Sequence, residues 1–164
     1  MRIKIPLPPP ILKEKALSQE PHFNSQIKLR VGDMNYGNHM GNDTVLSLAH
    51  EFRVQLFDQY GQNELSFFGK GIIMADSAIQ YRAQGFWGQI IKAHLWYIPT
   101  SQMRFDLYYR LFTQGTSHEE EDIAYIKTGQ VFFDYEQQKV SSPHGEDSLK
   151  YMNFLKELNV AALI

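Results

Sequence analysis

Apolar and polar residues alternate along residues 25–31, where Ile27, Leu29 and Val31 share one side. A period of two is typical of a half-buried strand. From Asp43 to about Tyr60 the apolar residues recur instead at a period near 3.6. The apolar positions of this second segment are Val45, Leu48, Ala49, Phe52 and Leu56. They predict a long helix with one apolar stripe, which must face a sheet.

Residues that favour helix ends bound this segment. Asn42 or Asp43 is expected to cap the start of the helix, and Gly61 is expected to end it. The preceding residues, 32–42, are rich in glycine and asparagine, which tolerate positive φ or bond their own backbone. The sequence therefore predicts a structured loop between the first strand and the helix.

Long apolar and aromatic runs dominate the chain after Gly71. The predicted strands are Ile72 to Tyr81, Gln89 to Ile98, Met103 to Thr113 and Asp122 to Tyr135. Glycines and Pro99 between the runs supply hairpin signals, so the sheet is expected to be mainly antiparallel. A last helix is predicted from Asp147 to Leu158. Its expected apolar face consists of Leu149, Met152, Leu155 and Leu158.

One helix can cover only one of the two faces of an antiparallel sheet, whereas these strands are apolar at nearly every position. The uncovered surface therefore needs a partner. Symmetric dimers are the commonest solution, so we expect a homodimer or a dimer of dimers.

Composition narrows the class of protein. A chain of 164 residues that is 43% hydrophobic fits one compact domain. A net charge of -2 argues against a nucleic-acid partner. No run approaches the roughly 18 apolar residues that a membrane-spanning helix needs. The prolines near the start indicate an extended N-terminal arm over residues 1–23.

Cysteine and histidine usage limits the chemistry. Without cysteine the chain has no disulfide and no thiolate nucleophile, and the cytoplasm is the expected location. The six histidines show no paired spacing typical of a metal site, so no metal and no cofactor are expected. A serine hydrolase is also disfavoured, because no Gly-x-Ser-x-Gly elbow occurs.

The loop before the helix carries a family resemblance. It reads Asp33-Met34-Asn35-Tyr36-Gly37-Asn38-His39-Met40-Gly41-Asn42, and the helix continues to His50-Glu51-Phe52-Arg53. With the order of elements, this resembles the hot-dog superfamily of thioesterases, specifically the 4-hydroxybenzoyl-CoA thioesterase group. Members carry an Asp-x-Asp-x-x-Gly-His-Val-Asn-Asn run, then a helix with an aromatic residue, an acid and an arginine. The likeness covers roughly residues 24–145, through Ile79-Gln80-Tyr81 and the strand near Lys127.

The resemblance implies an α+β hot-dog fold, in which a mainly antiparallel sheet of five or more strands wraps a long central helix. It places the hot-dog domain at residues 24–145, followed by a C-terminal helix at 146–164. The implied activity is hydrolysis of an acyl-CoA thioester to free acid and coenzyme A.

The implied mechanism uses the start of the central helix. Its first backbone amides have no intrahelical partner and lie at the positive end of the helix dipole, so they can bind the thioester oxygen. Gly41 and Asn42 are assigned to this oxyanion site, with His50 on the substrate side. A carboxylate across a dimer groove then attacks the carbonyl carbon or activates a water.

The chain departs from the family at the usual catalytic aspartate, the second acid of the loop. That position is Asn35, whose amide can orient water but cannot take its proton. Three nearby carboxylates are candidates to replace it: Asp33, Asp43 and Glu51. Asp43 comes first, because it adjoins the oxyanion donors and His50 projects from the same helical face. Glu51 comes second, and His39 and Asn35 complete the candidate catalytic set.

Each candidate also has a purely structural interpretation. Asp43 is a typical helix cap, and Asn35 and Asn38 are typical of left-handed turns. His39 can lock the loop by a hydrogen bond. Glu51 and Arg53 can form a solvated or subunit-facing pair. These interpretations stay open on the sequence alone.

The sequence gives weaker evidence about which residues contact the substrate. Residues expected to line an acyl tunnel are Phe67, Phe68, Phe86 and Trp87, and those expected to contact coenzyme A phosphates are Lys92, Arg104 and Arg110. The rival hypothesis is a hot-dog protein that binds acyl-CoA or acyl-carrier protein without hydrolysing it. Asn35 favours this rival, because it removes the usual acid.

Overall fold

A strand, a long helix and four further strands follow one another in the order that the sequence predicted. The computed structural model describes residues 20–115 and 119–160. Its elements are β1 (Phe23–Lys28), the short 3-10 helix η1 (Val31–Asp33), α2 (Asn42–Gln59), β2 (Gly71–Tyr81), β3 (Ile90–Ser101), β4 (Arg104–Gln114), β5 (Glu120–Asp134), β6 (Lys139–Val140) and α3 (Gly145–Glu157). Most of the expected N-terminal arm and the last four residues of the chain lie outside the described residues.

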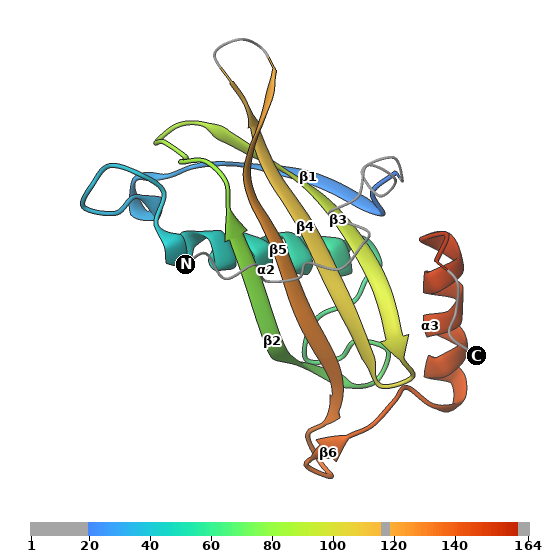
Figure 1. Cartoon of the computed structure of the whole chain (residues 1–164). Helices are drawn as coiled ribbons and strands as arrows, with labels where there is room; N and C mark the ends of the chain where they lie inside the picture. Colours follow the sequence, from blue (N-terminus) through green and yellow to red (C-terminus); the bar gives the residue numbers. More distant parts are fainter. Residues whose placement is uncertain (1–19, 116–118, 161–164) are drawn as a thin grey trace, which may run out of the picture.

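The strands form one antiparallel sheet that α2 crosses on one face (Figure 1). The strand order is β1-β3-β4-β5-β2, and the short β6 pairs with β5. Each pair of neighbours is antiparallel. This arrangement confirms the predicted α+β class with a mainly antiparallel sheet and a long central helix.

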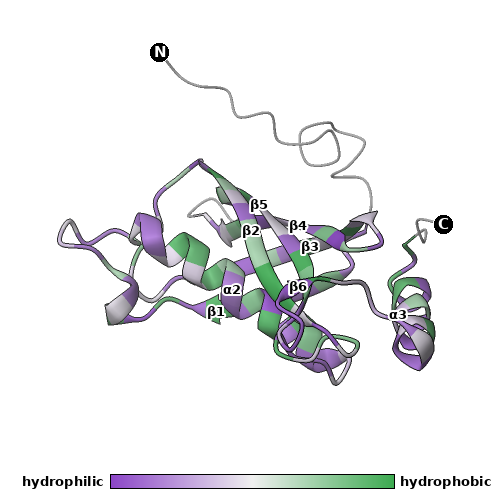
Figure 2. Ribbon diagram, turned by 90° about the horizontal axis from the view of Figure 1, so that it is seen from below, coloured by the Kyte–Doolittle hydropathy of each residue, from purple (hydrophilic) through white to green (hydrophobic). Residues whose placement is uncertain are grey.

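The apolar stripe of α2 packs against the sheet as predicted. All five of its residues are buried, and Phe52 and Leu56 are fully so. Figure 2 shows hydrophobic segments on α2 and on the strands next to it. Gly61, with a φ of 65°, follows the C-cap residue Tyr60, so the predicted C-terminal end is confirmed.

The predicted N-terminal caps of α2 were wrong. The helix begins at Asn42 and its N-cap is Gly41, which has no side chain to bond the first amides. The first strand also ends earlier than its alternation predicted, because the chain turns into η1. Val31 is therefore 75% exposed instead of facing the core.

The helix α3 buries only half of its predicted apolar face, namely Leu155 and Leu158. Leu149 and Met152 are exposed, whereas Tyr151 and Phe154 are buried together with Leu155. The larger aromatic rings are buried instead because they pack into an aromatic cluster at the end of the sheet. In this cluster the hydroxyls of Tyr97 and Tyr151 hydrogen-bond at 2.9 Å. The helix therefore belongs to the main core.

Phe67 and Phe68 belong to the same core, which corrects their prediction as tunnel residues. Phe67 has no exposed surface and Phe68 is 6% exposed. The ring of Phe67 lies 4.2 Å from that of Phe57 and 5.8 Å from that of Phe132. The loop after α2 is thus fixed between the helix and the sheet.

The strand β2 forms one edge of the sheet and β1 the other. Along β2 the side chains from Ile73 to Ser77 are exposed, and they include Met74 at 41%. Of the helices among residues 20–115 and 119–160, none is long and apolar enough to cross a membrane.

Candidate active site

Asp33 fixes the base of the loop that precedes α2. Its carboxylate accepts hydrogen bonds from the backbone and the guanidinium of Arg30, at 2.7 and 3.2 Å. Its carbonyl oxygen accepts from the amide of Gly41 and from Thr44 Oγ1, both at 3.0 Å. Burial raises the pKa of Asp33, but the bonds from Arg30 outweigh it and hold the pKa below its ordinary value. This candidate acid is therefore occupied in holding the loop.

The loop closes through Asn35 and His39. The side-chain oxygen of Asn35 accepts from the amides of Gly37 at 2.8 Å and of His39 at 3.3 Å, while the Asn35 amide donates to the His39 carbonyl at 2.8 Å. Asn38 adopts the left-handed conformation, with a φ of 59°. The ring of His39 meets Phe86 edge-on at 5.3 Å, and its Nδ1 is buried without a hydrogen-bond partner among the described residues. The Asn35 oxygen is thus used by the loop itself.

The start of α2 offers fewer amide donors than expected. Because the amide of Gly41 donates to the Asp33 carbonyl, it is not available to a ligand, which corrects the prediction for Gly41. The next amides, of Asn42 and Asp43, belong to the first helical turn and have no partner within the helix. These two amides lie at the positive end of the helix dipole, next to that of Thr44, which also has no partner within the helix.

Gly41 also makes room for the carboxylate of Asp43. A Cβ atom at position 41 would lie 2.4 Å from Asp43 Oδ1 and 3.2 Å from Thr44 Oγ1. The Asp43 side chain therefore folds back over the helix start, on the exposed side of the first turn. A carboxylate and unpaired amides are brought together at this end of α2.

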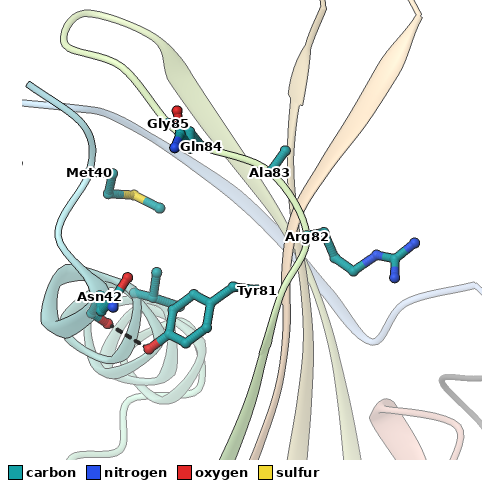
Figure 3. A pocket seen from close by; sticks show the side chains of 8 residues that line it. Met40, Asn42, Tyr81, Arg82, Ala83, Gln84 and Gly85 are labelled. Carbon is teal, nitrogen blue, oxygen red and sulfur yellow. Dashed lines mark hydrogen bonds between the residues drawn. The ribbon is translucent and has the colours of Figure 1, made fainter. Parts of the chain in front are cut away.

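A pocket of about 280 Å³ opens beside this turn. Its lining residues are Met40, Asn42, Val45, Tyr81 and residues 82–85. Figure 3 shows Tyr81 pointing toward Asn42, whose carbonyl accepts a 3.1 Å hydrogen bond from the Tyr81 hydroxyl, while Arg82 points away. Of the predicted site residues that the structure describes, Asn42 alone lines this pocket, so the amide donors and the pocket share one residue.

Glu51 lies on the opposite flank of α2. Its Oε1 accepts from Gln55 Nε2 at 3.0 Å, and Gln55 in turn accepts from Ser25 of β1. Asn42 is bonded instead to Tyr81 of β2, at the other edge of the sheet. The structure therefore does not bring Glu51 to the pocket.

His50 and Arg53 share an unpredicted partner, Glu64. His50 Nε2 lies 2.9 Å from Glu64 Oε2, and Arg53 Nε donates to Glu64 Oε1. Burial raises the pKa of Glu64, but the hydrogen bonds and charges of His50 and Arg53 hold it below its ordinary value. Arg53 therefore pairs with Glu64, and not with Glu51 as the sequence had suggested. Glu64 lies in a loop fourteen residues after His50, where no local pattern marked it.

The residues expected to contact coenzyme A differ in availability. Arg110 is bonded to Glu120 at 2.8 Å and to Asp122 at 2.7 Å, so it is less available to a phosphate than the sequence suggested. Arg104 is exposed and Lys92 half-buried. Phe86 and Trp87, which follow the pocket residue Gly85 in the sequence, are exposed and do not belong to the core. Within the described part of the chain, no group of three His, Asp or Glu side chains is arranged to hold a metal ion.

Comparison with protein families gives the decisive observation. The profile of the thioesterase-like superfamily matches residues 29–155, from the end of β1 into α3. The chain belongs to the thioesterase-like superfamily. The match includes the loop before α2, the helix start and the pocket residues. A comparison with curated proteins gave no match.

Solved structures of this superfamily share the fold. A thioesterase-superfamily protein from Jannaschia sp. CCS1 superposes with a TM-score of 0.72 at 16% identity, over 98% of each chain. A 1,4-dihydroxy-2-naphthoyl-CoA thioesterase from Synechocystis gives 0.71 at 13% identity, over 85% of this chain and 98% of the other. The DHNA-CoA thioesterase from Staphylococcus aureus gives 0.69 at 14% identity, over 83% and 91%. These likenesses confirm the hot-dog fold.

Proposed function

We propose that the chain is an acyl-CoA thioesterase, which hydrolyses the thioester of a coenzyme A conjugate to the free acid and coenzyme A. The observation that carries the proposal is the start of α2, where the amides of Asn42 and Asp43 have no intrahelical partner and adjoin a pocket. Superfamily membership supports it. Two of the similar structures are named as thioesterases of an aromatic CoA ester.

The amides act on the charge that develops during the reaction. When the carbonyl carbon of the thioester is attacked, its oxygen becomes negative. Two backbone donors at the positive end of α2 stabilise that oxygen more than the neutral carbonyl. The apolar wall formed by Met40 and Val45 receives part of the acyl group and keeps water from the donors.

Asp43 is the proposed acid of the site. Of the three candidate carboxylates, that of Asp33 is held by Arg30 and that of Glu51 lies on the far flank, whereas Asp43 folds over the helix start. Its role is to attack the carbonyl carbon or to activate a water. Asn35 and His39 support the reaction from the loop by holding the backbone in place.

The assembly is part of the proposal. The exposed edge of β2 lies on the pocket side of the molecule, since Tyr81 belongs to both. A second copy paired along β2 completes the groove, so the enzyme is a homodimer or a dimer of dimers. A cytoplasmic location is proposed with it, because the chain depends on no disulfide.

The second candidate function is binding of acyl-CoA or acyl-carrier protein without hydrolysis. The specific observation in its favour is Asn35, which stands where the family has its loop acid and whose oxygen is committed to the loop. A protein of this kind would hold the thioester at the same amides and release it intact.

A thiol-release assay separates the two functions. The purified protein is incubated with a panel of short, long and aromatic acyl-CoAs, and free thiol is followed with time. Hydrolysis predicts steady release of many thiols per chain for at least one member of the panel. Heat of binding by calorimetry without thiol release would identify the binding protein instead.

A further inference from the structure

One exposed tyrosine spans the rim of the pocket beside α2. The buried residues that line this pocket are Met40, Val45 and Gly85, whereas Tyr81 is 49% exposed. Figure 3 shows the ring of Tyr81 reaching toward α2, where its hydroxyl donates to the Asn42 carbonyl at 3.1 Å. Because this bond uses the carbonyl of Asn42, the amide of the same residue stays available to a substrate.

The Tyr81 side chain is held at both of its ends. Tyr81 is the last residue of β2 and lies opposite Ala124 of β5. The amides of the next two residues, Arg82 and Ala83, both donate to the Ile123 carbonyl, at 2.9 and 3.3 Å. The hydroxyl at the other end is held by the first turn of α2. A ligand that presses on the ring must therefore break a hydrogen bond before the ring can turn aside.

The pocket is closed at the end where Gly85 lies. The carbonyl of Gly85 accepts from the Met40 amide at 2.8 Å. A Cβ atom at position 85 would lie 3.1 Å from Leu29 Cδ1 and 3.2 Å from Met40 Cβ. Because the backbone packs this closely on two core side chains, an acyl chain finds no further depth here. An acyl group that outgrows the pocket has to displace Tyr81 or turn back into water.

The volume of the pocket determines how large an acyl group fits. About 280 Å³ holds about nine groups of the size of a water molecule, at about 30 Å³ each. A hexanoyl group has about seven non-hydrogen atoms and a dodecanoyl group about thirteen, so only the first fits. In an open-ended channel each further buried methylene would strengthen binding about fourfold. A closed pocket ends that gain once it is full.

We propose that Tyr81 is a specificity-determining residue of the site, whose ring, held by the Asn42 carbonyl, limits the acyl group to about nine non-hydrogen atoms. The inference rests on the proposed function, which places the thioester at the free amides of the first turn. It goes beyond that function by naming a compact acyl group as the substrate class. Long-chain acyl-CoA is accordingly a poor ligand of the wild type.

The test measures binding separately from hydrolysis. S-hexyl- and S-dodecyl-coenzyme A are thioethers, which contain no thioester bond, and calorimetry gives their dissociation constants below micelle-forming concentrations. Hexanoyl-CoA and dodecanoyl-CoA are assayed for thiol release with the same preparations. The variants are Tyr81→Ala, which removes the ring, and Tyr81→Phe, which removes only its hydrogen bond. Tyr135→Ala is the matched control, because Tyr135 is 48% exposed and does not line the pocket.

The quantity compared is the preference for the longer chain over the shorter one. For the wild type we expect a preference of no more than about threefold, against about fourfold for each of the six extra methylenes in an open channel. Tyr81→Ala should raise the preference at least about tenfold and Tyr81→Phe about threefold, in binding and in kcat/KM alike. Tyr135→Ala should leave it within about twofold of the wild type.

Each other result contradicts a definite part of the inference. A wild type that prefers the dodecyl ligand strongly, an unchanged preference in Tyr81→Ala, or an equal shift in Tyr135→Ala would overturn Tyr81 as the size limit. Wild-type behaviour of Tyr81→Phe would overturn the role of the hydroxyl. A wild type that binds the thioethers with the expected preference but releases no thiol would overturn the proposed hydrolysis alone, and one that binds neither would overturn both.

Discussion

Gly41 limits where the carboxylate of Asp43, the proposed acid, can lie. Because a Cβ atom there would come within 2.4 Å of Asp43 Oδ1, the glycine leaves room for the carboxylate above the helix start. The contact is with the end of a flexible side chain, so the carboxylate can move aside when a methyl group is added. The fold is therefore expected to tolerate a substitution at Gly41 that displaces the proposed acid.

The variant Gly41→Ala is expected to fold and to lose activity. The φ of Gly41 is -62°, which suits any residue, so the melting temperature of the variant should change by no more than a few degrees. Displacement of Asp43 by about 1 Å should lower thiol release by about 100-fold. Thermal denaturation and the thiol-release assay, run on the same preparation, check both halves, and full activity with alanine would contradict this view of Asp43.

Asp33 gives a prediction for stability at acid pH. Its pKa is lowered in the folded protein, so its contribution is complete above the unfolded value of about 3.9 and is lost as the pH falls through the folded value. Asp33→Asn should cost about 1 to 3 kcal/mol near neutral pH and should flatten the loss of stability between about pH 5 and pH 2. Denaturant titrations at several pH values measure this. Parallel pH profiles for both proteins would contradict it.

Single residues of the site could be predicted only where a local pattern marked them. The resemblance of the loop to the thioesterase run singled out Asn35 and His39, and Asp43 was chosen because it adjoins the expected oxyanion donors. Glu64 was not predicted as a partner of His50 and Arg53, because these residues lie fourteen and eleven residues earlier, across a turn of the chain. The hydrogen bond from the Gly41 amide to the Asp33 carbonyl was not predicted either, because it depends on how the loop folds back on Asp33.

At the scale of elements, periodicity predicted α2 and the strands to within a few residues. The α2 stripe succeeded because it faces a sheet along its whole length, so burial follows helical spacing. The α3 stripe was right for Leu155 and Leu158 but wrong for Leu149 and Met152, because this helix touches the core along one narrow side, where Tyr151 and Phe154 find aromatic partners. Hydropathy alone ranks Leu149 and Met152 above Tyr151, although Tyr151 is the buried residue.

The loop after α2 is expected to be structural rather than part of the acyl tunnel. Phe67→Ala removes a fully buried ring that packs on Phe57 and Phe132, and it should destabilise the protein by about 3 to 5 kcal/mol. Trp87→Ala, at a position 67% exposed, should cost much less. Urea unfolding compares the two. A change in acyl preference without loss of stability in Phe67→Ala would restore the tunnel hypothesis.

The whole molecule has an exposed sheet edge next to its pocket. Edge strands with apolar side chains tend to pair with another strand, and β2 presents Ile73 and Met74. We predict a dimer or a dimer of dimers, with the sheets continuous across β2 and the two α2 helices close together. Light scattering at micromolar concentration should give two or four times the chain mass. A monodisperse monomer would contradict the shared groove.

The central claim is that the start of α2 hydrolyses acyl-CoA, and Asp43→Asn tests it most directly. The amide keeps the size of the side chain and loses about 0.3 to 1 kcal/mol of interaction with the helix dipole, so the fold should persist. With the best acyl-CoA of the panel, we predict that thiol release falls by about 100-fold or more. Near-full activity in Asp43→Asn, together with its loss in Glu51→Gln, would contradict the account and place the acid on the opposite flank of the helix.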